Sequence, residues 1–209
     1  MNRRFFGKIE VAFDAIYLLA ALTIGARALL GGKALIGAMA LVLALGDAFH
    51  LVPRMLAALG RGGLQRALGF GKLATSVTMT VFYVLLWHWG ALRFSPGGWT
   101  HAVHALAAVR VALCLFPQNR WPDDSPPVGW AVARNLPFLL QGIAVAALFY
   151  IIAPAVPGVG WVWLAVLLSF AFYLPVALFA DRNRRLGMLM LPKTIMYLWI
   201  LFQIAGIPG

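Results

Sequence analysis

The sequence predicts an all-α integral membrane protein that forms a single bundle of seven transmembrane helices. Hydrophobic residues make up 63% of the 209-residue chain, and its mean hydropathy is +0.88. A soluble domain of this size could not bury so much apolar surface. A helix that crosses a hydrocarbon core of about 30 Å needs about 20 residues, and seven apolar stretches approach that length. The predicted helices, within one domain of residues 1–209, are 11–30, 34–58, 71–93, 99–117, 135–156, 160–180 and 186–207.

The distribution of positive charge predicts the orientation of these helices. Of the 17 Lys and Arg residues, 12 lie at the N-terminus or in and beside the loops that follow the second, fourth and sixth helices. Because cytoplasmic loops are enriched in Lys and Arg, the N-terminus is expected in the cytoplasm and the C-terminus outside. The net charge of +11 then reflects topology, and we expect no nucleic-acid partner.

The first predicted helix resembles a secretion signal in one respect only. Three basic residues, Arg3, Arg4 and Lys8, precede its apolar run. That run is longer than the apolar region of a typical signal peptide, and Asp14 interrupts it. We therefore expect it to be retained as a membrane helix.

The second predicted helix carries the most informative polar residues. Asp47 and His50 are three residues apart, so they share one face of a helix, and Arg54 follows four residues after His50. Gly46, beside Asp47, would allow another helix or a ligand to approach closely. Ionisable side chains at membrane depth are costly, which makes this face a candidate functional site.

Other predicted helices place polar residues at a similar depth. These are Asp14 and Tyr17 in the first, Lys72 and Ser76 in the third, Arg110 in the fourth, Asp181 at the end of the sixth, and Lys193 and Tyr197 in the seventh. One interpretation is a water-accessible cavity in the cytoplasmic half that holds an acid/base pair. The other is charge neutralisation, such as Asp47 with Lys193 or Asp14 with Arg110, that only holds helices together.

The remaining features are less specific. A polar, proline-rich loop at 118–127 separates four predicted helices from three, and its Asp123 and Asp124 are expected to be solvated. The single cysteine, Cys114, excludes an intrachain disulfide and a cysteine-based metal site.

Three histidines, His88, His101 and His104, are predicted near the opposite membrane face. Three imidazoles can bind zinc, but no acid lies nearby as a partner, so interfacial histidines are expected. Because His50 is predicted at the other face, the pattern also argues against seven-helix zinc hydrolases of the ceramidase and adiponectin-receptor type. The predicted cytoplasmic N-terminus argues against a retinal protein that uses Lys193. We expect neither a metal nor a cofactor.

Several motifs resemble the YhhN-type lysoplasmalogenase family of small polytopic membrane proteins. They are the run from Gly46 to Arg54, the run from Gly69 to Ser76, the segment Val81-Phe82-Tyr83, and the segment from Tyr197 to Gln203 in the last helix. Position 77 is Val where the family has His, and only Ala180-Asp181 approximates the family's late acid. The family has eight helices, one more than predicted here.

The resemblance implies hydrolysis of the vinyl ether of a single-chain lysolipid. In that reaction a carboxylic acid protonates the alkene carbon, and water attacks the resulting oxocarbenium ion. The implied catalytic residues are Asp47 as the acid, Asp181 or Asp14 as the second carboxylate, and His50 as a base that orients water. Lys72 or Arg54 would hold the lipid phosphate.

The sequence leaves other functions open. The residues proposed to contact a substrate in the cavity are Arg54, Lys72, Ser76, Arg110, Lys193 and Tyr197. The same cavity would serve a non-enzymatic transporter or small-molecule binding protein in which Asp47 and Lys193 form a gating pair. A structural membrane subunit is a third possibility. The expected partners are membrane lipid and a lysolipid or other small amphipathic ligand, the expected location is a bacterial inner membrane, and the oligomeric state is not predicted.

Overall fold

The structure, a computed structural model, describes residues 3–123, 125–180 and 183–206, and every regular element in these ranges is helical. The elements are α1 (Arg3–Leu30), α2 (Ala34–Ala58), α3 (Gln65–Ala91), α4 (Trp99–Leu115), the 3-10 helix η1 (Pro117–Asn119), α5 (Val128–Ile152), α6 (Val162–Phe179), the 3-10 helix η2 (Arg184–Leu189) and α7 (Met190–Ala205).

The predicted all-helical fold is confirmed, and six of the helices are long and apolar enough to cross a membrane. The exception is α4, which is apolar but has only 17 residues. The helices α1, α3 and α5 begin about seven residues before the predicted apolar stretches. Hydropathy locates only the apolar part of a helix, whereas backbone hydrogen bonding continues through the polar residues that precede it.

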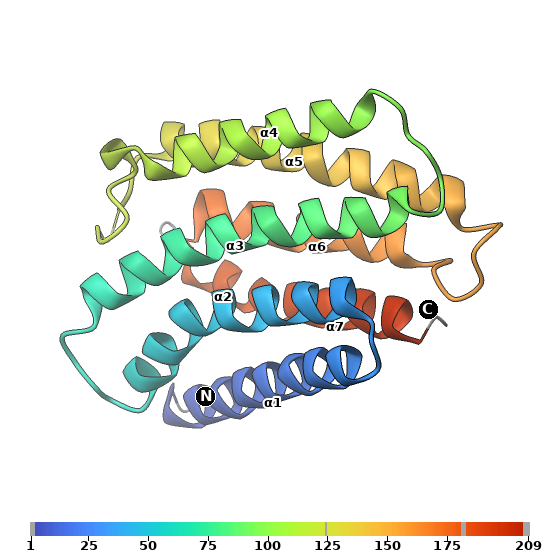
Figure 1. The fold of residues 1–209 in the computed structure, drawn as a ribbon. Coiled ribbons are helices and arrows are strands. Elements are labelled where there is room, and N and C mark those ends of the chain that lie inside the picture. The colour runs from blue at the N-terminus through green and yellow to red at the C-terminus, as the bar shows by residue number, and fades with distance from the viewer. Residues whose placement is uncertain (1–2, 124, 181–182, 207–209) are drawn as a thin grey trace.

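The seven α-helices run roughly along one common direction (Figure 1), and their contacts close them into a ring. Each helix packs against its neighbours in the chain, and α7 returns to pack against α1 and α2. The N-terminus lies at the same end of the bundle as the α2–α3 and α4–α5 connections, and the C-terminal end of α7 lies at the other. We call these the amino end and the carboxyl end. The positive-inside expectation corresponds to an amino end in the cytoplasm.

An aromatic cluster fills the middle of the ring. The ring of Tyr83, on α3, is fully buried and has its centroid 5.1 Å from Phe138, 5.4 Å from Phe170 and 6.4 Å from Tyr197. Its hydroxyl lies 2.9 Å from the Ser169 Oγ on α6. The hydroxyl is thus satisfied while the ring supplies apolar contact, which joins four helices at one point.

Glycines bring α2 and α3 into close contact. A Cβ placed on Gly71 would overlap the Phe49 carbonyl oxygen and lie 2.6 Å from the His50 Cα. At Gly46, where the sequence suggested a close approach, a Cβ would lie 2.5 Å from the Cβ of Thr78, which confirms that expectation. Thr75 also donates a 3.0 Å hydrogen bond to the Gly46 carbonyl. The register of these two helices, which positions His50, therefore depends on small residues.

This contact predicts opposite effects for two glycine-to-alanine changes. Gly71→Ala places a methyl group against backbone atoms of α2, so it should lower the stability by about 1–3 kcal/mol. Gly129→Ala, at a helical position with open space around it, should leave the stability unchanged or raise it by up to about 1 kcal/mol. Thermal unfolding of both purified variants in detergent measures the difference. Equal midpoints for the two variants would contradict the close helix contact.

Candidate functional site

A cavity of about 480 Å³ lies at the amino end of the bundle, bordered by residues of α2 to α7 and of the loop after η1. Its inner part is bordered by buried side chains, including Met79, Phe138 and Tyr197. Phe138 and Tyr197 are both members of the aromatic cluster around Tyr83. The cavity therefore extends from the loop region down to the centre of the bundle.

Positive charge dominates the lining of this cavity. Among the described lining residues, five are Lys or Arg and one, Asp123, is acidic. The cations come from five different helices: Arg54 on α2, Lys72 on α3, Arg110 on α4, Arg134 on α5 and Lys193 on α7. Asp123 already forms a 2.6 Å ion pair with Arg120. Such a lining attracts anions.

Arg110 is the most deeply buried of these cations, with 1% of its surface exposed. Its guanidinium carbon lies 3.1 Å from the centroid of the Phe138 ring. Two of its nitrogens, Nε and Nη1, are buried without a hydrogen-bond partner. A cation–π contact contributes about 0.5–2 kcal/mol, whereas burying a charge without an anion costs several kcal/mol. The positive charge of Arg110 is therefore not balanced by a direct ion pair with a described carboxylate.

Lys193 has a similar environment. It is 3% exposed, and its Nζ lies 5.0 Å from the centroid of the Tyr197 ring and 5.4 Å from that of Tyr173. Within the described part of the chain, no carboxylate oxygen lies within 4.0 Å of Lys72, Arg110 or Lys193. Three cations of the cavity thus have no described carboxylate as a direct partner.

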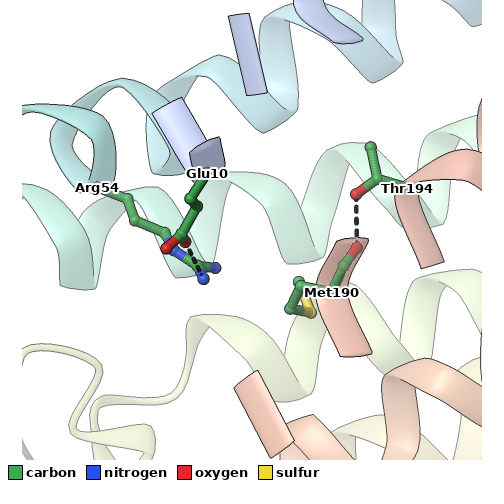
Figure 2. Close-up of polar contacts among 4 residues, drawn as sticks. All are labelled: Glu10, Arg54, Met190 and Thr194. Carbon is green, nitrogen blue, oxygen red and sulfur yellow. Dashed lines mark hydrogen bonds and ion pairs between the residues drawn. The ribbon is translucent and has the colours of Figure 1, made fainter. Parts of the chain in front are cut away.

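The two other cations have polar partners. Arg54 forms an ion pair with Glu10 of α1, and Figure 2 shows the two side chains meeting between their helices. The same view shows the first turn of α7, where the Thr194 hydroxyl donates a 2.8 Å hydrogen bond to the Met190 carbonyl. Arg134 donates a 2.9 Å hydrogen bond to the Asn119 Oδ1. These contacts hold the rim of the cavity in place.

The predicted catalytic acids lie outside the cavity lining. Asp47 is 5% exposed, and its Oδ2 accepts a 2.6 Å hydrogen bond from the Tyr17 hydroxyl. Asp14 is 4% exposed and also lies behind the lining. Asp181 is outside the described residues, as is Asp124 of the proline-rich loop.

The alternative interpretation was that Asp47 neutralises Lys193 and Asp14 neutralises Arg110, and the structure brings only the first pair near each other. Lys193 is an electrostatic neighbour of Asp47, although the two do not form a direct ion pair. The charged neighbours of Asp14 are Glu10, Arg54 and Asp47, not Arg110.

The predicted binding residues, in contrast, converge. All six residues proposed to contact a substrate border the cavity, as does His50: Arg54, Lys72, Ser76, Arg110, Lys193 and Tyr197. The His50 Nδ1 is buried without a hydrogen-bond partner. The Ser76 hydroxyl donates to the Lys72 carbonyl at 2.8 Å, which leaves its oxygen lone pairs available.

Sequence reasoning missed the part of the site formed by the loop after α4. Trp121, Pro122, Asp123 and Pro126 all border the cavity. A Cβ on Gly69 would lie 2.7 Å from the Pro122 Cα, so the loop packs directly on α3. The polar composition predicted a solvated loop. The one sequence feature that could have indicated packing against the bundle is Trp121, an aromatic residue among polar ones. Arg134 and Tyr173 were also missed.

Asn119 holds this loop in place. It is fully buried, and its Nδ2 donates to the carbonyls of Leu113 at 2.7 Å, Cys114 at 3.2 Å and Phe116 at 2.8 Å. One side chain thereby satisfies carbonyls at the end of α4 that have no intrahelical partner. The next residue, Arg120, has a left-handed backbone with φ of 49°. The end of α4 and the entry to the loop are thus coupled through Asn119.

Removing the Asn119 side chain should release the loop. Asn119→Ala removes the hydrogen bonds to three carbonyls at the end of α4 and to the Arg134 guanidinium, and a buried polar group left without a partner costs about 1–3 kcal/mol. We expect faster proteolytic cleavage within residues 120–127 of the folded protein. Gln118→Ala, at the exposed neighbouring position, is the matched control. Unchanged cleavage in Asn119→Ala would show that the loop is held by other contacts.

The histidines near the carboxyl end do not form a metal site in the described part of the chain. His88 and His104 lie with their Nε2 atoms 2.9 Å apart. No described group of three or more His, Cys, Asp or Glu side chains is placed to hold an ion. Their position at helix ends is typical of interfacial side chains.

Comparison with known proteins gives no match: no family model, no curated protein and no solved structure is similar to this chain.

Proposed function

We propose that the protein binds a single-chain anionic lipid, with the lipid phosphate in the amino-end cavity. The observation that carries this proposal is the buried Arg110 side chain, which has two nitrogens without a hydrogen-bond partner and borders a cavity lined by four further cations. An anion in the cavity would give Arg110 a negatively charged partner, because no described carboxylate oxygen lies within 4.0 Å of it. Arg in particular matches phosphate oxygens with parallel hydrogen bonds.

The position and size of the cavity favour a lipid. A volume of about 480 Å³ falls within the range of about 300–1,000 Å³ for small-ligand sites. Its lining also includes apolar side chains, among them Leu68, Met79 and Val176. In a bundle whose helices are long and apolar enough to cross a membrane, these side chains suit the first part of a hydrocarbon chain.

Hydrolysis of a vinyl-ether lysolipid with a zwitterionic head group is a second candidate function, separate from the binding of an anionic lipid. The resemblance to lysoplasmalogenases motivates it, and His50 in the lining supports it by offering a base beside the cations. The proposed acid, Asp47, does not border the cavity, but it is an electrostatic neighbour of Lys193, which does. On this hypothesis the protein is a lysoplasmalogenase-like membrane hydrolase. If it does not hydrolyse the vinyl ether, it is a lipid binder or transporter.

Equilibrium binding tests the proposal. The purified protein in detergent would be titrated with fluorescent lysophosphatidic acid, alongside the variants Arg110→Met and Arg93→Met. Arg93 is the matched control because it lies beyond α3 at the other end of the bundle and does not border the cavity. We expect the affinity to fall at least tenfold in Arg110→Met and to stay unchanged in Arg93→Met. Equal affinities in all three proteins would overturn the proposal.

A separate assay decides between hydrolase and binder. Incubation with lysoplasmalogen, followed by mass spectrometry, measures release of the fatty aldehyde. Aldehyde release that is lost in His50→Gln and Asp47→Asn would assign the hydrolysis to these residues. If folded, lipid-binding protein releases no aldehyde, the hydrolase candidate is rejected and binding or transport remains.

A further inference from the structure

The charges of the cavity lining bear on which lipid head group it could hold, and this step rests on the proposed function. Among the described lining residues, the acid is Asp123, which is already paired with Arg120. A zwitterionic head group, such as phosphocholine, carries a positive group that needs an acidic or aromatic partner of its own. The aromatic rings nearest the deep cations, Phe138, Tyr173 and Tyr197, are already in contact with Arg110 or Lys193.

The number of cations without an acidic partner also favours a terminal phosphate over a zwitterionic head group. Arg54 is neutralised by Glu10, whereas Lys72, Arg110 and Lys193 have no described carboxylate within 4.0 Å. A phosphodiester brings one negative charge. A terminal phosphate brings about 1.5–2 charges at neutral pH and three acceptor oxygens. Three cations on three different helices therefore suit a terminal phosphate, with its three oxygens, better than a phosphodiester with one negative charge.

We propose that the cavity selects a terminal phosphate monoester over a zwitterionic phosphodiester. Arg110 and Lys193 bind the phosphate at the inner part of the cavity, and Lys72 binds it from α3. The ligand class is therefore a single-chain lipid that ends in phosphate. A choline or ethanolamine group would be placed among like charges, where it is repelled.

Four ligands test this selectivity on the full-length protein in one detergent. They are lysophosphatidic acid, lysophosphatidylcholine with the same acyl chain, glycerol 3-phosphate and inorganic phosphate. We expect lysophosphatidic acid to bind at least tenfold more tightly than lysophosphatidylcholine. The two chainless phosphates should compete with lysophosphatidic acid only at much higher concentration.

The outcomes distinguish a failure of the head-group selectivity from a failure of the proposed lipid binding. Equal affinity for the two lysolipids overturns the head-group selectivity and leaves lipid binding in place. Binding of none of the four ligands by folded protein rejects both. Glycerol 3-phosphate binding as tightly as lysophosphatidic acid supports the recognition of a terminal phosphate and contradicts the lipid part of the proposed function.

Variants supply a second readout that does not depend on absolute affinity. Lys72→Gln, on the partly exposed part of α3, should narrow the preference for lysophosphatidic acid because it removes one of three cations. Arg93→Met should keep the full preference. An unchanged preference in Lys72→Gln would remove this residue from the head-group site.

Discussion

Arg110→Met should weaken lipid binding at least tenfold and raise the stability of the protein. The wild-type guanidinium is 1% exposed, with two nitrogens that lack a hydrogen-bond partner. Methionine has a similar length, keeps contact with the Phe138 ring and removes the desolvated charge. Replacing a buried ion pair by apolar side chains is often neutral or stabilising by about 1–4 kcal/mol, and Arg110 has no direct ion pair to lose. The same change deletes the cation that we place at the centre of the anion site.

The combination of the two effects makes this prediction specific. A residue that serves only packing would lower stability when replaced, and any loss of binding would follow from unfolding. Thermal unfolding and lysophosphatidic acid binding, measured on the same preparation, separate these cases. Lower stability together with retained binding in Arg110→Met would contradict the assigned role.

Asp47→Ala should cause the largest loss of stability. The change leaves the Tyr17 hydroxyl, now 2.6 Å from Oδ2, without its acceptor, and removes the negative charge nearest to Lys193. Breaking a buried charge interaction on one side costs about 3–5 kcal/mol. Tyr17→Phe, which removes the hydrogen bond and keeps the carboxylate, should cost about 1–3 kcal/mol.

A second substitution tests the cause of this loss. In Asp47→Ala, the added change Lys193→Met should restore part of the stability, because it removes the cation that the carboxylate compensates. A coupling of about 0.5–3 kcal/mol is typical of interacting residues. Strictly additive losses in the double variant would show that Asp47 and Lys193 act independently, and the helix-holding interpretation of this pair would then be wrong.

The sequence alone predicts the helices and much of the site, for reasons that these residues illustrate. Apolar length locates membrane helices because lipid leaves few alternatives to a hydrogen-bonded helix. Polar residues at membrane depth are rare enough that Arg110, Lys72 and Lys193 stand out, and the structure brings them to one cavity.

The roles of these residues were harder to predict than their positions. The spacing of Asp47 and His50 places both on one face of α2, yet His50 borders the cavity and Asp47 lies behind its lining, bonded to Tyr17 of α1. Helical periodicity gives an angle around one helix, whereas the packing of α1 and α7 decides which part of that face is covered. The docking of the loop by Asn119 depends on hydrogen bonds to α4 and to Arg134, which no periodicity reveals.

The most direct test of the central claim is to locate the bound lipid. Lysophosphatidic acid with a photoreactive group beside its glycerol would be cross-linked to the membrane-embedded protein, and the labelled peptides identified by mass spectrometry. The account predicts labelling within residues 65–79 and 190–197, with less labelling in Arg110→Met than in Arg93→Met. Labelling confined to the apolar groove among α3, α4 and α5 at the carboxyl end, which Trp87, Leu106 and Ile143 border, would contradict it.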